Sequence, residues 1–175
     1  IGTDEAGRKL YFDIAIIARD HYWHLGSHNV DSIIADLPFD NLEDYLIQSV
    51  FFERMAVSSK IVCIGVSSYE LEDDSVQGST LTDILSLKRA QNLAKTIDHA
   101  MAFVKGDDLR SKISTIPIYV VALGKHTIHD KQFSNLQRSV IVLSIIKEDS
   151  QINMDQAIHN GILKLGNSMP VNILN

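Results

Sequence analysis

The sequence contains a single cysteine, Cys63, among 175 residues, which excludes a disulfide within the chain. Cys63 lies in the apolar run IVCIG, where we expect a buried thiol that packs as a small hydrophobic residue. The sequence also has no run of about 18 apolar residues and no charged-then-apolar leader, so we expect neither a membrane-spanning helix nor a signal peptide. Because the chain begins at Ile1 and not at methionine, we interpret it as a processed form.

Positive charge is scarce as well. The chain has 16 Lys and Arg residues against 22 Asp and Glu residues, and its formal net charge of -6 argues against a protein that mainly binds nucleic-acid phosphates. It lacks a glycine-rich phosphate loop, and no residue set supplies a nucleophile, a base and a group that orients the base. We therefore expect a binding module without a cofactor, in preference to an enzyme.

Length and hydrophobic content predict one domain over residues 1–175, because 45% of the residues are hydrophobic and the length is within the single-domain range. Residues 19–38 are mixed and polar, which indicates an irregular crossover. Alternating apolar and β-branched runs predict strands, and apolar residues three and four positions apart predict helices. The expected strands are 10–18, 59–68, 116–124 and 138–146, and the expected helices are 41–56, about 80–104 and 153–166.

This order of elements predicts an α/β (α+β) two-layer sandwich. Strand, helix, strand, helix, strand, strand and helix follow one another, so the sheet should have four strands and be mixed. It should be parallel across the helical crossovers and antiparallel where a loop joins the third and fourth strands. Gly106 is a natural stop for the second helix, and the extra C-terminal helix should dock on the sheet. The apolar face of the second helix is expected at Ile84, Leu87, Ala90, Ala94, Ile97, Met101 and Val104.

The second helix carries the most specific motif of the chain, LSLKRAQNLAKTI at residues 85–97. It resembles the helix signature of OmpA-like peptidoglycan-binding domains, with Thr82 where that family has Asn. The order of elements over a core of about 10–146 agrees with the same family, which opens with a strand that reads like LYFDI. The positions that match the signature outright are Leu85, Ser86, Arg89 and Ala90.

The resemblance implies a ligand site at one edge of the sheet. In the family, the helix arginine and an aspartate in a turn after the second strand hold the diaminopimelate of peptidoglycan, so Arg89 and Ser86 are the corresponding candidates here. Ser68 occupies the place of the aspartate. Asp73 and Asp74, in an acidic loop of unusual length, are candidates to supply the missing carboxylate. Arg138 corresponds to one of the two arginines that open the family's last strand.

The resemblance also implies a non-catalytic module of the bacterial cell envelope that binds a peptidoglycan peptide or an envelope protein. A periplasmic location follows from it, with a cytoplasmic one as the alternative, and the oligomeric state stays open. A second interpretation is a protein-interaction domain without wall binding, in which Ser86 and Arg89 belong to an ordinary helix surface.

The further alternative is a metal-dependent enzyme, and two separate features of the sequence support it. His21 and His24 follow the first strand and His126 and His129 follow the third, so parallel strands would bring both pairs to one edge, where imidazoles bind zinc well. Separately, IGTDEAG at the start of the sequence resembles the opening motif of type 2 ribonucleases H, in which the residues equivalent to Asp4 and Glu5 bind catalytic divalent ions.

Overall fold

The computed structural model describes residues 1–16, 23, 27–30, 33, 41–67, 76–125 and 140–165. Each predicted strand and helix has a counterpart in this part of the chain, and two short elements and a helix break were not expected. In chain order the elements are β1 (Gly2–Thr3), β2 (Lys9–Ile16), α1 (Leu42–Gln48), α2 (Phe51–Met55), β3 (Lys60–Ser67), α3 (Val76–Met101), α4 (Asp107–Ile113), β4 (Ile118–Lys125), β5 (Ile141–Glu148) and α5 (Met154–Leu165).

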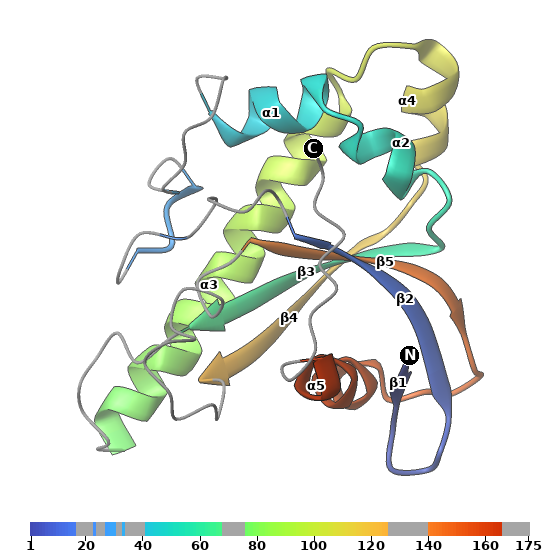
Figure 1. Cartoon of the computed structure of the whole chain (residues 1–175). Helices are drawn as coiled ribbons and strands as arrows, with labels where there is room; N and C mark the ends of the chain where they lie inside the picture. Colours follow the sequence, from blue (N-terminus) through green and yellow to red (C-terminus); the bar gives the residue numbers. More distant parts are fainter. Residues whose placement is uncertain are drawn as a thin grey trace.

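The strands form one mixed sheet with the order β1-β2-β5-β3-β4 (Figure 1). β3 and β4 pair in parallel, whereas β5 is antiparallel to both of its neighbours, β2 and β3. β2, β3 and β4 therefore run in one direction and β5 in the other. The mixed sheet is confirmed, but the predicted strand number of four is wrong, because the short β1 adds a fifth strand antiparallel to β2. The third and fourth predicted strands are not neighbours, since β3 lies between them.

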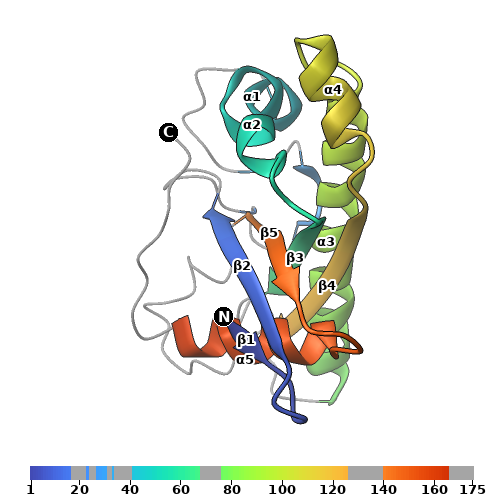
Figure 2. The same cartoon turned by 90° about the vertical axis from the view of Figure 1, so that its right-hand side faces the viewer.

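Alternating side chains of β3 pack into two separate clusters, one on each face of the sheet. Ile61 and Cys63 belong to the cluster that includes α3 and residues of α1 and α2. Val62 and Ile64 belong to the cluster that includes α5. The α/β sandwich is thus confirmed. α5 docks on the sheet as predicted; it packs on the sheet of its own chain, which the sequence left open, and on the face opposite to α3. Figure 2 shows α1, α2 and α4 gathered at the end of the sheet where β3 begins.

Cys63 is fully buried, as its apolar surroundings predicted. Burial disfavours the thiolate and raises the pKa of the Cys63 thiol far above its ordinary value. The thiol therefore acts as a small hydrophobic side chain of the core.

The predicted helix over residues 41–56 is in fact two short helices. Asn41 caps α1, because its side-chain oxygen accepts a hydrogen bond of 2.9 Å from the backbone N–H of Asp44. The backbone of Ser49 is extended and ends α1, and its hydroxyl oxygen accepts a hydrogen bond of 3.2 Å from the N–H of Phe51. A serine whose hydroxyl group accepts a hydrogen bond from the start of the next helix favours two separate helices over one continuous helix.

The boundaries of α3 also differ from the prediction. The helix begins at Val76, before the expected start near Thr80, and it ends at Met101. Gly106, expected to stop α3, instead begins α4 with a positive φ of 97°. None of the helices in the described ranges is both long and apolar enough to cross a membrane.

A buried carboxylate joins the β1–β2 turn to the start of α5. Asp4 accepts hydrogen bonds from the backbone N–H groups of Ala6 and Arg8, both at 3.0 Å, and from Arg8 Nε at 2.7 Å. It also accepts one of 3.0 Å from the N–H of Asn153, 149 positions away in the sequence. Four hydrogen bonds satisfy a carboxylate that is 5% exposed, so they give Asp4 a structural role. Glu5, the second residue of the nuclease-like motif, is exposed.

The sheet and α3 approach each other closely at Gly65. A Cβ atom at this position would lie 1.6 Å from the backbone oxygen of Ser86 and 3.0 Å from the backbone nitrogen of Ala90. Only glycine permits this approach, because any side chain would have to push α3 away from β3.

We predict that Gly65→Ala lowers the free energy of unfolding by about 3 kcal/mol or more, because the added methyl group meets backbone atoms that cannot move alone. Urea unfolding followed by circular dichroism measures this loss. Gly7→Ala is the matched control: Gly7 has open space around its Cβ position and a φ of 78°, so its cost is only about 1–2 kcal/mol. Equal losses for the two variants would contradict the close contact.

We also predict that Asp4 contributes to the free energy of unfolding and that acid removes this contribution. Desolvation raises the pKa of Asp4, but the hydrogen bonds from Asn153 and Arg8 together outweigh it and hold the pKa below its ordinary value of 3.8. A carboxyl group whose pKa is lower in the folded state than in the unfolded state stabilises the fold at pH values above its unfolded-state pKa. This stabilisation is lost as the pH falls through the folded-state pKa. Asp4→Asn should therefore be less stable than the wild type at neutral pH, and the difference should shrink between about pH 5 and pH 3.

Urea midpoints at several pH values test this prediction. The control variant Asp13→Asn removes an exposed carboxylate of β2 and should keep the pH dependence of the wild type. A gap between Asp4→Asn and the wild type that stays constant down to pH 3 would show that the Asp4 charge has no such role.

Candidate functional site

Four strand ends meet at one edge of the sheet. Ile141, the first residue of β5, is paired both with Ile16 at the end of β2 and with Ile64 near the end of β3. The ends of β3 and β4 lie beside each other, since Ser67 is paired with Lys125. β2, β3 and β4 therefore end at the same edge, as expected for the two histidine pairs and the acidic loop. Ligands commonly bind beyond the carboxyl ends of parallel strands.

Most of the predicted site residues follow or precede these strand ends in sequence. Of the ligand candidates, Ser68, Asp73, Asp74 and Arg138 lie outside the described residues, and so do the four histidines His21, His24, His126 and His129. Within the described ranges, no group of three or more His, Cys, Asp or Glu residues is placed to hold a metal ion. The roles of these residues remain predictions. The structure describes the ends of the strands next to them in the sequence, but not the residues themselves.

The two helix candidates, Ser86 and Arg89, are both fully buried against the sheet. The interpretation of these residues as an ordinary helix surface is therefore wrong. The predicted apolar face of α3 is wrong only at its start, because Ile84 and Leu87 are 45% and 41% exposed. The face that packs on the sheet begins with Ser86 and the correctly predicted Ala90, whose small size lets α3 approach Gly65. It continues through Leu93, Ile97 and Ala100.

The guanidinium group of Arg89 lies at the end of β3, where it joins three parts of the chain. Its Nη1 donates a hydrogen bond of 2.9 Å to the carbonyl oxygen of Val66, near the end of β3. Its Nε donates one of 2.8 Å to the carbonyl oxygen of Ser27, in the crossover between β2 and α1. Hydrogen bonds that involve a charged donor are stronger than neutral ones, so both contacts fix the orientation of the side chain.

An aromatic ring adds to this arrangement. The guanidinium carbon of Arg89 lies 5.6 Å from the ring centroid of Trp23, within the range of a cation–π interaction. Trp23 is fully buried and belongs to the core cluster on the α3 face. Its position identifies this residue, the only tryptophan of the chain, as a core side chain that contacts the candidate cation.

A second side chain of α3 holds the same crossover, one turn after Arg89. The Asn92 side-chain nitrogen donates a hydrogen bond of 2.8 Å to the carbonyl oxygen of His28 and lies 3.0 Å from its ring Nδ1. Positions 89 and 92 lie on adjacent turns of one helix face. The sequence shows an arginine and an asparagine three residues apart, which places both on one helix face. It does not show that they bind the carbonyl groups of residues 27, 28 and 66, because a backbone carbonyl group is present at every position.

The arrangement provides a fixed cation at the edge where the strands end. A guanidinium group has five N–H donors in a planar fork, and two of those of Arg89 bind backbone carbonyl oxygens. Arg89 is fully buried, and these contacts hold its guanidinium group in one orientation between α3, the end of β3 and the crossover.

Comparisons with known proteins give a limited result. No family model matches the sequence, and no curated protein matches it. Among solved structures, the chain is similar to the OmpA-like domain of FopA1 from Francisella tularensis subsp. tularensis SCHU S4, with 13% sequence identity, 86% of this chain and 93% of that chain covered, and a TM-score of 0.42.

Proposed function

We propose that the chain is a non-catalytic binding module of the cell envelope and that its ligand is the diaminopimelate-containing peptide of peptidoglycan. The observation that carries this proposal is the position of Arg89. Its guanidinium group is fixed at the end of β3 by the carbonyl oxygens of Val66 and Ser27. In this proposal Arg89 binds the ligand carboxylate, as the matching arginine does in the family that the helix motif resembles.

The ligand ammonium group needs a fixed anion in the same site. Asp73 and Asp74 follow β3 in the sequence, and we assign this role to one of them because Ser68 replaces the family's turn aspartate. A carboxylate within about 3 Å of the ammonium group would form a charge-assisted hydrogen bond. Ser86 supports the site indirectly, since its contact with Gly65 sets the position of α3.

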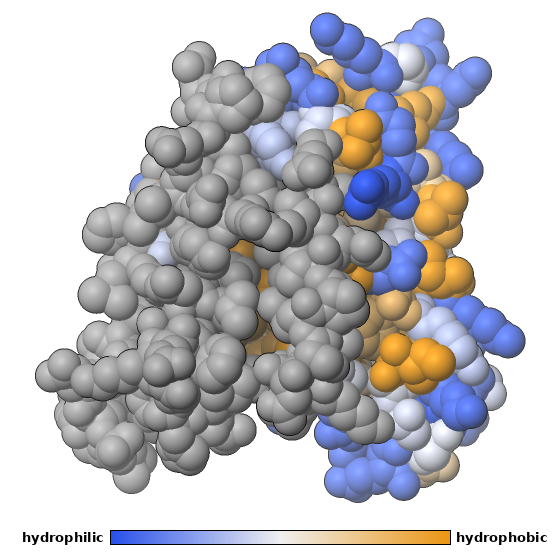
Figure 3. Space-filling model, viewed as in Figure 1, coloured by the Kyte–Doolittle hydropathy of each residue, from blue (hydrophilic) through white to orange (hydrophobic). Residues whose placement is uncertain are grey.

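The burial of Arg89 favours a second candidate function, a protein-interaction domain without wall binding. A side chain that is fully buried, with its donors on backbone carbonyl groups, also fits a purely structural role. On the face shown in Figure 3, the described apolar residues form separate patches between hydrophilic ones, as on an ordinary solvated surface. A partner bound on that part of the protein would therefore make mainly polar contacts.

We predict that the purified protein sediments with insoluble peptidoglycan and that Arg89→Ala reduces the bound fraction at least about tenfold, because a charge-assisted contact with the ligand carboxylate is lost. The same change should lower the free energy of unfolding by about 2–4 kcal/mol, since the buried carbonyl group of Val66 and the half-buried one of Ser27 lose a charged donor. Binding is therefore measured well below the melting temperature of each variant, with circular dichroism as a check of the fold.

Lys88→Ala is the matched control, because Lys88 is the exposed neighbour of Arg89 on α3 and its loss should leave binding unchanged. Arg89→Lys keeps a positive charge and serves as the second variant if Arg89→Ala does not fold; it should bind more weakly than the wild type because lysine lacks the planar fork. Fluorescence of Trp23, which lies beside the guanidinium group, reports whether the local structure is kept. Absence of binding by the folded wild-type protein would rule out the wall function and favour the protein-interaction domain.

A further inference from the structure

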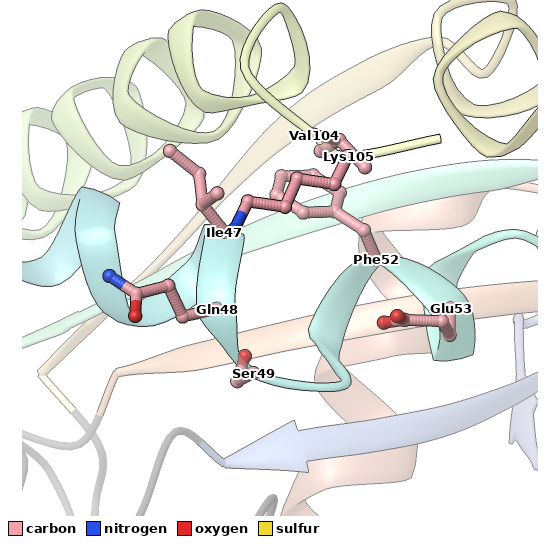
Figure 4. A pocket seen from close by; sticks show the side chains of 7 residues that line it. All are labelled: Ile47, Gln48, Ser49, Phe52, Glu53, Val104 and Lys105. Carbon is pink, nitrogen blue, oxygen red and sulfur yellow. The ribbon is translucent and has the colours of Figure 1, made fainter. Parts of the chain in front are cut away.

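The break between α1 and α2 leaves a cavity at the end of the sheet opposite to Arg89 (Figure 4). Its volume is about 290 Å³, just below the range of about 300–1,000 Å³ that is typical of small-molecule sites. One continuous helix over residues 41–56 would have no such break. The residues that line the cavity are Ile47, Gln48, Ser49, Phe52, Glu53, Val104 and Lys105.

Capping hydrogen bonds hold both walls of the cavity. On the helical side, the N–H of Ser49 donates to the carbonyl oxygen of Tyr45, and its hydroxyl oxygen accepts from the N–H of Phe51 at 3.2 Å. On the other side, Arg110 of α4 donates a hydrogen bond of 3.1 Å to the carbonyl oxygen of Val104 and forms an ion pair with Asp107. The cavity is therefore formed before any ligand binds, which lowers the entropy cost of binding.

The lining combines one accessible apolar side chain with two opposite charges. Phe52 and Val104 are 1% and 3% exposed, so they close the cavity from beneath, and the half-buried Ile47 offers apolar surface to a ligand. Glu53 and Lys105 are exposed, and neither forms an ion pair with another of the described residues. Figure 4 shows Glu53 on α2 and Lys105 on the connection between α3 and α4, with Phe52 between them. The two charges thus stand on different walls of one cavity.

We propose that this cavity binds a small linear zwitterion that has a short apolar segment between its charges. The ligand carboxylate pairs with the ammonium group of Lys105, and the ligand ammonium group pairs with the carboxylate of Glu53. The methylene groups between them pack on Ile47, while Gln48 and Ser49 supply further polar contacts at the rim. Charges at the two ends of a ligand match charges on two walls better than charges on one carbon atom do.

The test uses 6-aminohexanoate and its isomer norleucine, which has the same atoms but carries both charges at one end. Isothermal titration calorimetry with the whole chain should show that 6-aminohexanoate binds at least about tenfold more tightly than norleucine, hexanoate or hexylammonium. Lys105→Gln and Glu53→Gln should each weaken binding by about tenfold, because each removes one charged contact. Both side chains are exposed, so the variants should fold as the wild type does.

Lys112→Gln is the control, because it removes an exposed positive charge of α4 that does not line the cavity; it should bind like the wild type. Arg89→Lys should bind 6-aminohexanoate normally as well, so failure of the wall function and failure of this proposal can be told apart. Absence of 6-aminohexanoate binding, equal or tighter binding of norleucine, or equal binding by the Glu53 and Lys105 variants would each overturn the proposal.

Discussion

The close contact of β3 with α3 at Gly65 is the constraint on which the rest of the structure depends. It sets the distance between the helix and the sheet, because backbone atoms of Ser86 and Ala90 occupy the space of a side chain at position 65. Once this distance is set, the next residue on the same helix face, Arg89, lies at the end of β3. The guanidinium group then joins the helix to Val66 and to Ser27 of the crossover. The absence of a side chain at Gly65 therefore determines where Arg89, one of the two site candidates among the described residues, lies.

Local signals in the sequence predicted much of the fold. The predicted bounds of the last helix agree with α5, because Asn153 and Gln156 form a cap pair and the N–H of Gln156 donates to the Asn153 side chain. The strands were recognised from their apolar runs. The break at Ser49 and the start of α4 at Gly106 were missed, because a serine or a glycine can end one helix or begin another and only the packing decides which.

The site was less predictable than the fold. The motif identified Ser86 and Arg89, but it did not show that both are buried, since a charged residue on a helix is normally exposed. The partners of Arg89 are backbone carbonyl groups, and the burial of Trp23 beside it depends on where the crossover passes. Contacts between residues distant in sequence follow from the whole packing, so they have no local pattern. The cavity beside Glu53 and Lys105 was missed for the same reason, because it arises from a helix break.

The hydrogen bond between Asn153 and Asp4 has a consequence for the order of folding. The two residues are 149 positions apart, and the Cβ position of Gly2 would lie 1.9 Å from the backbone oxygen of Ala157, so β1 and α5 fit against each other along their backbones. During synthesis, β1 can pair early with β2, but α5 emerges from the ribosome only after nearly the whole described chain. Contacts of such sequence separation slow folding. The unit of β3, α3 and β4, whose contacts are nearer in sequence, can form first, and α5 can dock against β1 last.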